Sequence, residues 1–310
     1  MPSRTNRRAF LRAVGVGAAA VAMPAGTRAR ATTRRAGGEP FFFLQIADPQ
    51  LFWGPLELWK TAIRHANRLK PDFVVVCGDL LHRAADVAKL DAAEDEKRAR
   101  AYLDVAKTLD KGIPLYNLAG NHDVCNEPTP ETLRWYEKRF GKLWYRFTHK
   151  GSFFVALESD LFKHPAGARE AAARQLKWLE KTLGEASKRA YRHKVVFLHH
   201  PLCLKTVDEK ESYSTLPIPI RRRLLKLFGA HGIEATFSGH HHKNAYVRDG
   251  KLELVTTSSS GKPLGKDPAG FRIVKVYPDR IEHRYYGYDD LPDKVVLAPA
   301  GRSAGGKGRE

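Results

Sequence analysis

The sequence predicts an α/β fold in which two sheets carry helices on their outer faces. Three observations lead to this prediction. Short apolar runs alternate with amphipathic segments along most of the chain, the last third is rich in strand-like runs, and the composition is 43% hydrophobic and 28% charged over 310 residues. Such a composition is ordinary for a soluble globular domain. Alternating strands and helices followed by further strands favour two packed sheets over a bundle or a barrel.

The strands are predicted from short apolar runs and the helices from a period near 3.6 residues. The strand-like runs are 41–47, 73–77, 113–118, 153–157, 194–198 and 233–237, with 251–256, 271–277 and 280–283 towards the end. Helical periodicity fits 56–69, 94–109, 131–140, 169–183 and 219–228. Thr129 and Pro130 are the expected N-cap and first residue of the third helix.

Residues 1–31 are predicted to be a twin-arginine signal peptide. The stretch 5–12 reads TNRRAFLR, 13–23 is apolar, and 29–31 offers an A-x-A cleavage site. The apolar stretch is too short for a membrane-spanning helix of about 20 residues, so no stable membrane insertion is expected. We expect the twin-arginine export machinery as a partner, export of the folded protein, and a periplasmic or secreted location. A disordered basic arm is the alternative.

The charge of the remaining chain is moderately basic. Six of the 53 Lys and Arg lie in 1–31, which holds no acid, so 47 basic and 34 acidic residues remain and the net charge is +13. Such a surface attracts anionic partners, although scattered solvated Lys and Arg fit equally well. Residues 298–310 are predicted to be a disordered tail. The three cysteines suggest no disulfide framework, and a monomer is expected.

Five short blocks of metal-ligand residues follow predicted strands. In chain order they are Asp48 in IADPQ, Asp79 in VVVCGDLLH, Asn121-His122-Asp123 in LAGNHD, His199-His200 in FLHHPL, and His240 with His242 in FSGHHH. Between 31 and 78 residues separate neighbouring blocks. Because ligands in α/β folds gather beyond the carboxyl ends of strands, all five can meet in one cleft. Carboxylate, amide and imidazole together suit divalent metals, and a carboxylate can bridge two ions.

The ordered set of blocks resembles the calcineurin-like metallophosphoesterase family, whose pattern runs D-x-H, G-D, G-N-H-D/E, H and G-H-x-H. The likeness covers about 41–288. The segments ADPQ, CGDLLH, GNHDVCNEPTPETL, SGHHHKNA, LGKDPAGFRIV and EHRYYGYDDL are similar to a branch of protein serine/threonine phosphatases. The resemblance sharpens the α/β prediction to a four-layer α/β/β/α sandwich of two mixed sheets, the metallo-dependent phosphatase fold, over residues 39–297.

The resemblance also implies a role for each block. It makes Asp79 the carboxylate that bridges two divalent ions, and it implies attack by a metal-bridging hydroxide on a phosphate ester. Asp48 and His242 would bind the first ion, and Asn121, His199 and His240 the second. His122 would protonate the leaving oxygen. His200 is expected to be packed behind the ligands, and His241 is a candidate substrate contact.

Three departures from the family pattern are visible. Gln50 stands where the family has the His of D-x-H, so an amide oxygen or a water would serve the first ion, which favours Mn or Mg over Zn. We therefore expect Mn, with Fe, Zn or Mg as the other candidates. His82 replaces an Asp that commonly steadies the catalytic His, so Asp123 or another acid would do so here. The Arg that precedes G-N-H in the phosphoprotein phosphatases is Ala119 in this chain. Arg83 is either a phosphate clamp or a surface residue.

Three functions fit these residues. The first is a phosphomonoesterase acting on phosphoproteins or small phosphate monoesters, as the resembling branch implies. The second is a phosphodiesterase acting on cyclic nucleotides, nucleic acid or lipid headgroups, because the same metal core serves both reactions. The third is a non-catalytic basic binding protein, which the missing imidazole at Gln50 would favour.

Overall fold

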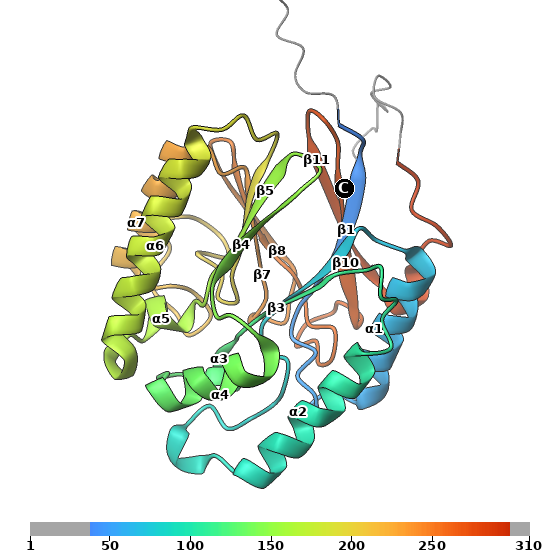
Figure 1. Cartoon of the computed structure of the whole chain (residues 1–310), viewed down its shortest axis with the longest axis vertical. Helices are drawn as coiled ribbons and strands as arrows, with labels where there is room; N and C mark the ends of the chain where they lie inside the picture. Colours follow the sequence, from blue (N-terminus) through green and yellow to red (C-terminus); the bar gives the residue numbers. More distant parts are fainter. Residues whose placement is uncertain (1–37, 298–310) are drawn as a thin grey trace, which may run out of the picture. The chain divides into compact units, whose positions relative to one another are not determined.

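The computed structural model describes residues 38–297, which lie in one compact unit, Arg35–Glu310. The predicted signal peptide, 1–31, and the predicted tail, 298–310, lie outside the described residues. Two mixed sheets organise the unit (Figure 1). None of the helices within 38–297 is long and apolar enough to cross a membrane.

The first sheet has five strands in the order β11-β10-β1-β2-β3. Parallel pairing joins β1 to β2 and β2 to β3, and antiparallel pairing joins β1 to β10 and β10 to β11. Its strands are β1 (Phe41–Ile46), β2 (Phe73–Cys77), β3 (Leu115–Leu118), β10 (Gly270–Val276) and β11 (Ile281–Gly287).

The second sheet has six strands in the order β4-β5-β6-β7-β9-β8. Its centre, β5-β6-β7-β9, is parallel, and the edge strands β4 and β8 are antiparallel to their neighbours. Its strands are β4 (Tyr145–His149), β5 (Ser152–Ala156), β6 (Lys194–Phe197), β7 (Ala235–Ser238), β8 (Ala245–Asp249) and β9 (Leu252–Thr256).

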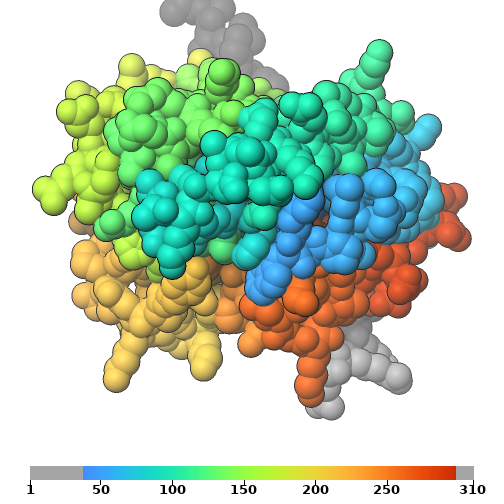
Figure 2. Space-filling model, turned by 90° about the horizontal axis from the view of Figure 1, so that it is seen from below, coloured from blue at the N-terminus to red at the C-terminus, as the bar shows by residue number. Residues whose placement is uncertain are grey.

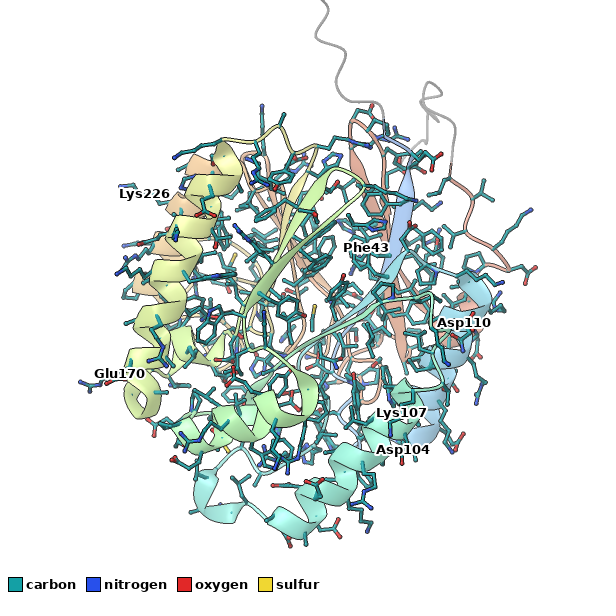
Figure 3. All side chains as sticks on the ribbon, in the orientation of Figure 1. Phe43, Asp104, Lys107, Asp110, Glu170 and Lys226 are labelled. Carbon is teal, nitrogen blue, oxygen red and sulfur yellow. The ribbon has the colours of Figure 1, made fainter. Side chains whose placement is uncertain are left out.

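Three apolar cores separate four layers. Successive residues of a strand point to opposite faces, so Phe41 and Phe43 of β1 enter a core between the two sheets while Leu44 and Ile46 enter a core under the helices. The inter-sheet core is aromatic, with the Phe43 ring 4.7 Å from that of Phe73 and stacked on it. Phe43 accordingly lies between the sheets in Figure 3. The predicted α/β/β/α sandwich is confirmed.

The outer layers are helical. The longer helices are α1 (Leu56–Leu69), α2 (Ala92–Ala106), α4 (Pro130–Phe140), α6 (Arg169–Ser187) and α7 (Ile218–His231), and the short ones are α3 (Asn121–Val124) and α5 (Asp160–Lys163). Buried residues of α1, α2 and α4 pack on the first sheet, and those of α6 and α7 pack on the second. Thr129 caps α4 and Pro130 is its first residue, as predicted.

The predicted elements are all present, and the prediction missed β4, β8, α3 and α5. Three 3-10 turns, Val87–Lys89, Ala166–Ala168 and Tyr288–Asp290, complete the described elements. Strands β1, β2, β3, β6 and β7 are each followed by one of the five ligand blocks. Figure 2 looks onto the edge where these strands end, and segments near residues 50 (blue), 90 (cyan), 210 (gold) and 265 (orange) meet there.

Candidate metal centre

The backbone beyond these strands is bent into an unusual conformation. Five ligand candidates have positive φ: Asp48 at 48°, Gln50 at 43°, Asp79 at 51°, His240 at 63° and His242 at 57°. Non-glycine residues adopt this region rarely, and it costs on the order of 1–3 kcal/mol each when the surrounding structure imposes it. The fold therefore holds the candidate ligands in place before any ion binds.

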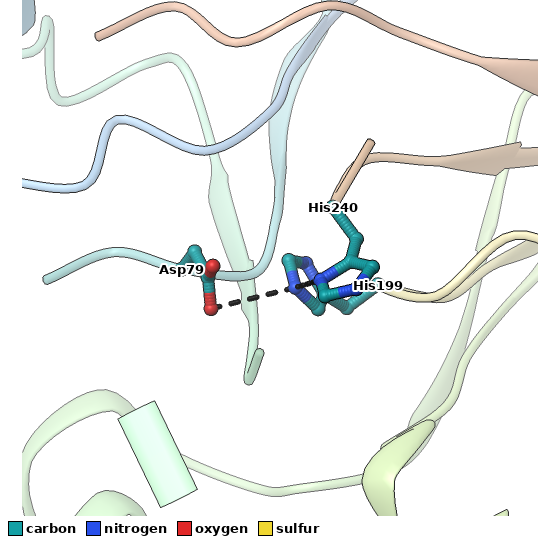
Figure 4. Close-up of side chains that lie close together, drawn as sticks. All are labelled: Asp79, His199 and His240. Carbon is teal, nitrogen blue, oxygen red and sulfur yellow. Dashed lines mark hydrogen bonds and ion pairs between the residues drawn. The ribbon is translucent and has the colours of Figure 1, made fainter. Parts of the chain in front are cut away.

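Two groups of side chains could each hold a metal ion. Asp79, His199 and His240 form one group, and Asp48, Asp79 and His242 form the other, with the ligand atoms of each group within 4.8 Å of one another. Figure 4 shows the first group, with Asp79 Oδ1 and His199 Nε2 3.4 Å apart. Asp79 belongs to both groups, so its carboxylate is placed to bridge two ions.

Each candidate histidine ligand has one ring nitrogen against a backbone carbonyl, which leaves the other for a metal. These contacts are His199 Nδ1 to Cys77 O at 2.9 Å, His240 Nε2 to Tyr213 O at 3.2 Å, and His242 Nδ1 to Lys262 O. The free nitrogens point at one another or at acids: His199 Nε2 lies 3.2 Å from His240 Nδ1, and His242 Nε2 lies 3.4 Å from Asp48 Oδ1.

Asn121 turns its amide oxygen towards the same point. Its Nδ2 donates to Asn126 Oδ1 at 3.0 Å and to the Tyr213 hydroxyl at 3.2 Å. Its Oδ1 lies 3.1 Å from His199 Nε2. The two donor contacts fix the orientation of the amide, so the oxygen joins the group of Asp79, His199 and His240.

Gln50 provides a test of whether a metal fits. Its Nε2 donates to Asp79 Oδ2 at 3.1 Å, and its buried Oε1 has no hydrogen-bond partner among the described residues. A buried acceptor without a partner costs about 1–3 kcal/mol. A hard cation between Gln50, Asp48 and Asp79 would satisfy that oxygen, so the residues present fit a divalent ion.

Burial and neighbouring charge shift the pKa values of these groups in the metal-free protein. Burial lowers the pKa of His240 well below its ordinary range, and the nearby His199 lowers it further. Burial also opposes the charged form of His242, but Asp48 outweighs it and raises the pKa of His242 to about 9. An imidazole must lose its proton to bind metal, so protons compete with an ion at His242.

His122 faces the centre from α3. Its backbone N–H donates to Asp79 Oδ1 at 2.9 Å, and its Nδ1 lies 2.7 Å from the carbonyl oxygen of Arg83. A carbonyl accepts only, so Nδ1 carries the hydrogen, and Nε2 is left for a substrate.

Asp123 does not orient this ring. Its carboxylate accepts backbone N–H groups from Gly120 at 2.9 Å, Leu80 at 3.1 Å and Leu81 at 3.2 Å. Burial and the charge of Asp79 raise the pKa of Asp123 to about 7. The expectation that Asp123 orients the His122 ring is wrong, because the Arg83 carbonyl makes that contact. Asp123 instead links the loop after β2 to the loop after β3.

One of the two roles expected of Arg83 is also wrong. It is buried, 3% exposed, so it is not the surface residue that was one of its two expected roles. Its Nε lies 2.9 Å from Asp95 Oδ2, its Nη1 donates to the Asp123 carbonyl, and its guanidinium lies 3.6 Å from the centre of the Trp135 ring. Because these contacts occupy the guanidinium, they give no support to the expected role of Arg83 as a phosphate clamp. Arg83 instead stabilises the loop that carries His122.

Two further histidines take different positions. His200 is buried, with Nδ1 3.0 Å from Ser159 Oγ and its ring 4.0 Å from that of His240, so it packs behind a ligand as expected. His241 is half-buried and has Nδ1 3.4 Å from Ser214 Oγ. It lies beside the loop that carries Tyr213, and its contact with substrate stays a prediction.

Sequence reasoning missed two aromatic neighbours of the centre. The Trp53 ring stacks on that of His82 at 5.2 Å, and His82 in turn lies 4.6 Å from His122. The Tyr213 ring lies 4.9 Å from that of His240. The only sequence signal was their type: Trp53 is an aromatic residue in a glycine-containing turn directly after a ligand block, and Tyr213 stands alone among polar residues.

Comparison with protein families shows that residues 43–244 match the family model described as calcineurin-like phosphoesterase. That range contains every one of the five ligand blocks. It also runs from β1 to the residue before β8, so the matched region supplies the strands that carry the centre.

Curated relatives and solved structures agree with this match. The chain is 35% identical over 279 residues to the serine/threonine-protein phosphatase CPPED1 of Bos taurus, covering 83% of this chain and 87% of that protein. It is 34% identical over 280 residues to the Homo sapiens protein of the same name, with the same coverage. The fold is similar to that of a dimetal phosphatase from Danio rerio, with a TM-score of 0.58, 15% identity, and coverage of 80% of this chain and 96% of that one.

Proposed function

Because the chain belongs to the calcineurin-like phosphoesterase family and is a metal-dependent phosphoric ester hydrolase, we propose that it is an exported phosphomonoesterase. One observation carries the proposal: two groups of possible ligands share Asp79 at one sheet edge. Support for monoesters comes from relatives that are named serine/threonine-protein phosphatases. Phosphorylated side chains or small phosphate monoesters are the proposed substrates.

The ligands would serve the reaction through charge and position. Asp48, Asp79 and His242 would hold one ion, with Gln50 completing that site through its unpartnered oxygen. Asn121, His199 and His240 would share Asp79 with the other. Two divalent ions held there would polarise the phosphoryl oxygens and lower the pKa of an attacking water.

His122 is proposed to supply the proton of the leaving alcohol. The Arg83 carbonyl holds Nδ1, so the ring cannot rotate without losing a 2.7 Å contact, and Nε2 is the atom that would deliver the proton. The hydrogen bond from the His122 backbone N–H to Asp79 Oδ1 holds the main chain of His122 beside the proposed bridging carboxylate. A positioned general acid of this kind typically contributes about 10² to 10⁴ in rate.

Mn is the metal that we propose. Two amide oxygens and two carboxylates are hard ligands, and only three imidazoles are present, a set that suits Mn or Mg better than Zn. Gln50 in place of an imidazole makes the site harder still. Fe, Zn and Mg are the alternative metals, and the activity of the protein reloaded with each metal distinguishes them from Mn.

Export by the twin-arginine pathway is part of the proposal. It is supported by Arg7 and Arg8 within TNRRAFLR and by the apolar and A-x-A stretches after them. Replacing both arginines with lysine should leave the protein in the cytoplasm at full length, as measured by fractionation and intact mass. Normal appearance of the double variant in the periplasm would rule this pathway out.

A test of the activity compares one monoester with one diester across metals. Protein stripped with a chelator is reloaded separately with Mn, Fe, Zn or Mg, and turnover of 4-nitrophenyl phosphate and bis(4-nitrophenyl) phosphate is measured. We expect the Mn protein to favour the monoester by at least about tenfold in kcat/KM, which corresponds to about 1.4 kcal/mol.

Two comparisons make the result specific. Asp104→Asn changes an exposed helix carboxylate in the same way as a substitution at the centre would, and it should leave all rates unchanged. Faster hydrolysis of the diester with every metal would replace the proposal with a phosphodiesterase. Absence of turnover for both esters with all four metals would contradict the assignment of this centre.

A further inference from the structure

Two exposed aromatic side chains stand beside the two ligand groups. Trp53 lies next to one of them, its ring 5.4 Å from that of His242, and Tyr213 lies next to the other, its ring 4.9 Å from that of His240. Their exposures are 39% and 60%. Exposed aromatic groups gathered beside a binding site commonly serve recognition, whereas scattered single ones need no explanation.

The large exposed apolar side chains are concentrated near the metal centre. Seven large hydrophobic residues are exposed within 38–297: Phe52, Trp53, Val87, Tyr213, Tyr246, Leu264 and Val296. Two besides the aromatic pair adjoin the centre, since Phe52 precedes Trp53 and the Leu264 N–H donates to the His242 carbonyl at 3.0 Å. The segments near residues 50 (blue), 210 (gold) and 265 (orange) lie on the face seen in Figure 2.

The backbone under Trp53 is fixed. Gln50 N–H donates to the Asp79 carbonyl at 2.8 Å, Leu51 N–H donates to the Leu80 carbonyl at 3.2 Å, and Trp53 N–H donates to the Gln50 carbonyl at 3.0 Å. One face of the Trp53 ring rests on His82. These contacts leave the loop little freedom to move. The exposure of Trp53 is therefore imposed by the fold.

The loop around Tyr213 is held by two buried cations. Lys163 Nζ donates to the carbonyls of Ser212 at 3.1 Å and Thr215 at 2.7 Å. Arg221, fully buried, donates from Nη2 to Thr215 Oγ1 at 3.1 Å. A buried charge is costly unless its hydrogen bonds are made, so these contacts fix the loop firmly. They hold the backbone on both sides of Tyr213 while its ring remains exposed.

We propose that Trp53 and Tyr213 form an aromatic subsite for the alcohol part of the substrate, so that the enzyme prefers phosphate esters whose leaving alcohol carries an aromatic ring. The inference rests on the proposed phosphomonoesterase activity. The metal centre would bind the phosphate, and the two rings beside it would pack against the ring of the alcohol. Aromatic pairs favour offset or edge contacts at 4.5–7 Å beyond simple burial. One such contact is worth a few-fold to about tenfold in kcat/KM.

The test uses two esters whose main difference is the aromaticity of the ring in the leaving alcohol. Benzyl phosphate and cyclohexylmethyl phosphate have primary alcohols as leaving groups and rings of similar size. The ratio of their kcat/KM values cancels general damage to the metal centre. We expect the parent protein to favour benzyl phosphate by about tenfold, and we expect Trp53→Leu and Tyr213→Leu each to lower that ratio about threefold or more.

Conservative and distant variants sharpen the outcome. Trp53→Phe retains a ring and should keep most of the preference. Tyr246→Leu removes an aromatic residue of β8 whose exposure, 51%, lies between those of Trp53 and Tyr213, and it should keep the parent ratio. Equal kcat/KM for the two esters in the parent, or the parent ratio in both leucine variants, would overturn the subsite and would mean that the rings only cover the ligands.

Failure of the underlying activity has a separate signature. Hydrolysis of neither ester by the Mn-loaded parent would contradict the phosphomonoesterase proposal itself. Hydrolysis of both esters at equal rates, with competitive inhibition by inorganic phosphate, would retain that activity and reject the aromatic subsite alone.

Discussion

Replacing Gln50 with His should strengthen metal binding and shift its preference towards Zn. The Gln50 side chain is buried between the ends of β1 and β2, with its amide nitrogen hydrogen-bonded to Asp79 and its amide oxygen without a hydrogen-bond partner within residues 38–297. A histidine there would present an imidazole nitrogen where the amide oxygen now lies. Borderline ions such as Zn gain more from nitrogen than Mn or Mg do.

The magnitude follows from the contacts of Gln50. The substitution removes a hydrogen bond to the Asp79 carboxylate, worth about 1.5–3 kcal/mol, and also an unpartnered acceptor that costs about 1–3 kcal/mol. These changes oppose each other, so the stability of the metal-free protein should change by less than about 2 kcal/mol. Each tenfold gain in affinity adds about 1.4 kcal/mol to the metal-bound protein. A gain of that size raises Tm by about 2–4 °C.

The measurement is a pair of titrations with Mn and Zn, followed by calorimetry and by thermal melting of chelated and reloaded protein. We expect Zn affinity to rise by about tenfold or more, Mn affinity to rise less, and turnover to stay equal or fall. Gln50→Leu is the control, since it removes both polar atoms and should weaken binding of both ions. Equal affinities of the parent protein and Gln50→His would show that position 50 does not face a metal.

Three other predictions concern the same centre and the second sheet. Asp79→Asn keeps the shape of the side chain and tolerates the left-handed backbone, so the protein should stay folded. It should lose its metal-dependent stabilisation and more than about 10³ in turnover. The same melting temperature of the parent protein with and without chelator would contradict this prediction. His122→Ala should retain both ions and lose about 10² to 10⁴ in rate on esters with poor leaving groups, whereas a lower metal content, measured by mass spectrometry, would make His122 a ligand. The hydrogen bond from His283 and further contacts lower the pKa of Glu253 to about 2. The stability that Glu253 contributes is therefore present above its unfolded pKa near 4.5 and is lost as pH falls through about 2. In urea melts, Glu253→Gln should lower the free energy of unfolding by about 1–2 kcal/mol at pH 7 and by almost nothing near pH 2. A loss of stability that does not depend on pH would refute this prediction.

Strands that are buried at every residue were the easiest elements to predict from the sequence. Strands such as β2, FVVVC, are buried at every residue, so a continuous apolar run marks them. The missed strands β4, YRFTH, and β8, AYVRD, lie at sheet edges with alternating or mostly exposed residues. Their strand character comes from pairing with β5 and β9, which is information from the fold rather than from local pattern.

The same distinction applies to the centre. Asp48, Asp79 and His199 were identifiable because a strand end places a polar residue at a fixed point relative to its neighbours. The sequence did not place Arg83 or Tyr213, since the position of a loop side chain depends on contacts that close over long separations. The contact of Tyr213 with Asn121 spans 92 residues, and that of Arg83 with the Asp123 carbonyl spans 40.

The left-handed backbone at the ligand positions bears on how this fold could evolve. Glycine adopts positive φ without strain, so exchanging Asp48, Asp79 or His240 for glycine would relax the main chain while abolishing a ligand. Selection for function holds these residues against that gain, which is a trade-off between stability and activity. A descendant released from catalysis should therefore accumulate glycine or asparagine at these positions, and such replacements would identify paralogues that keep the architecture but have lost the chemistry.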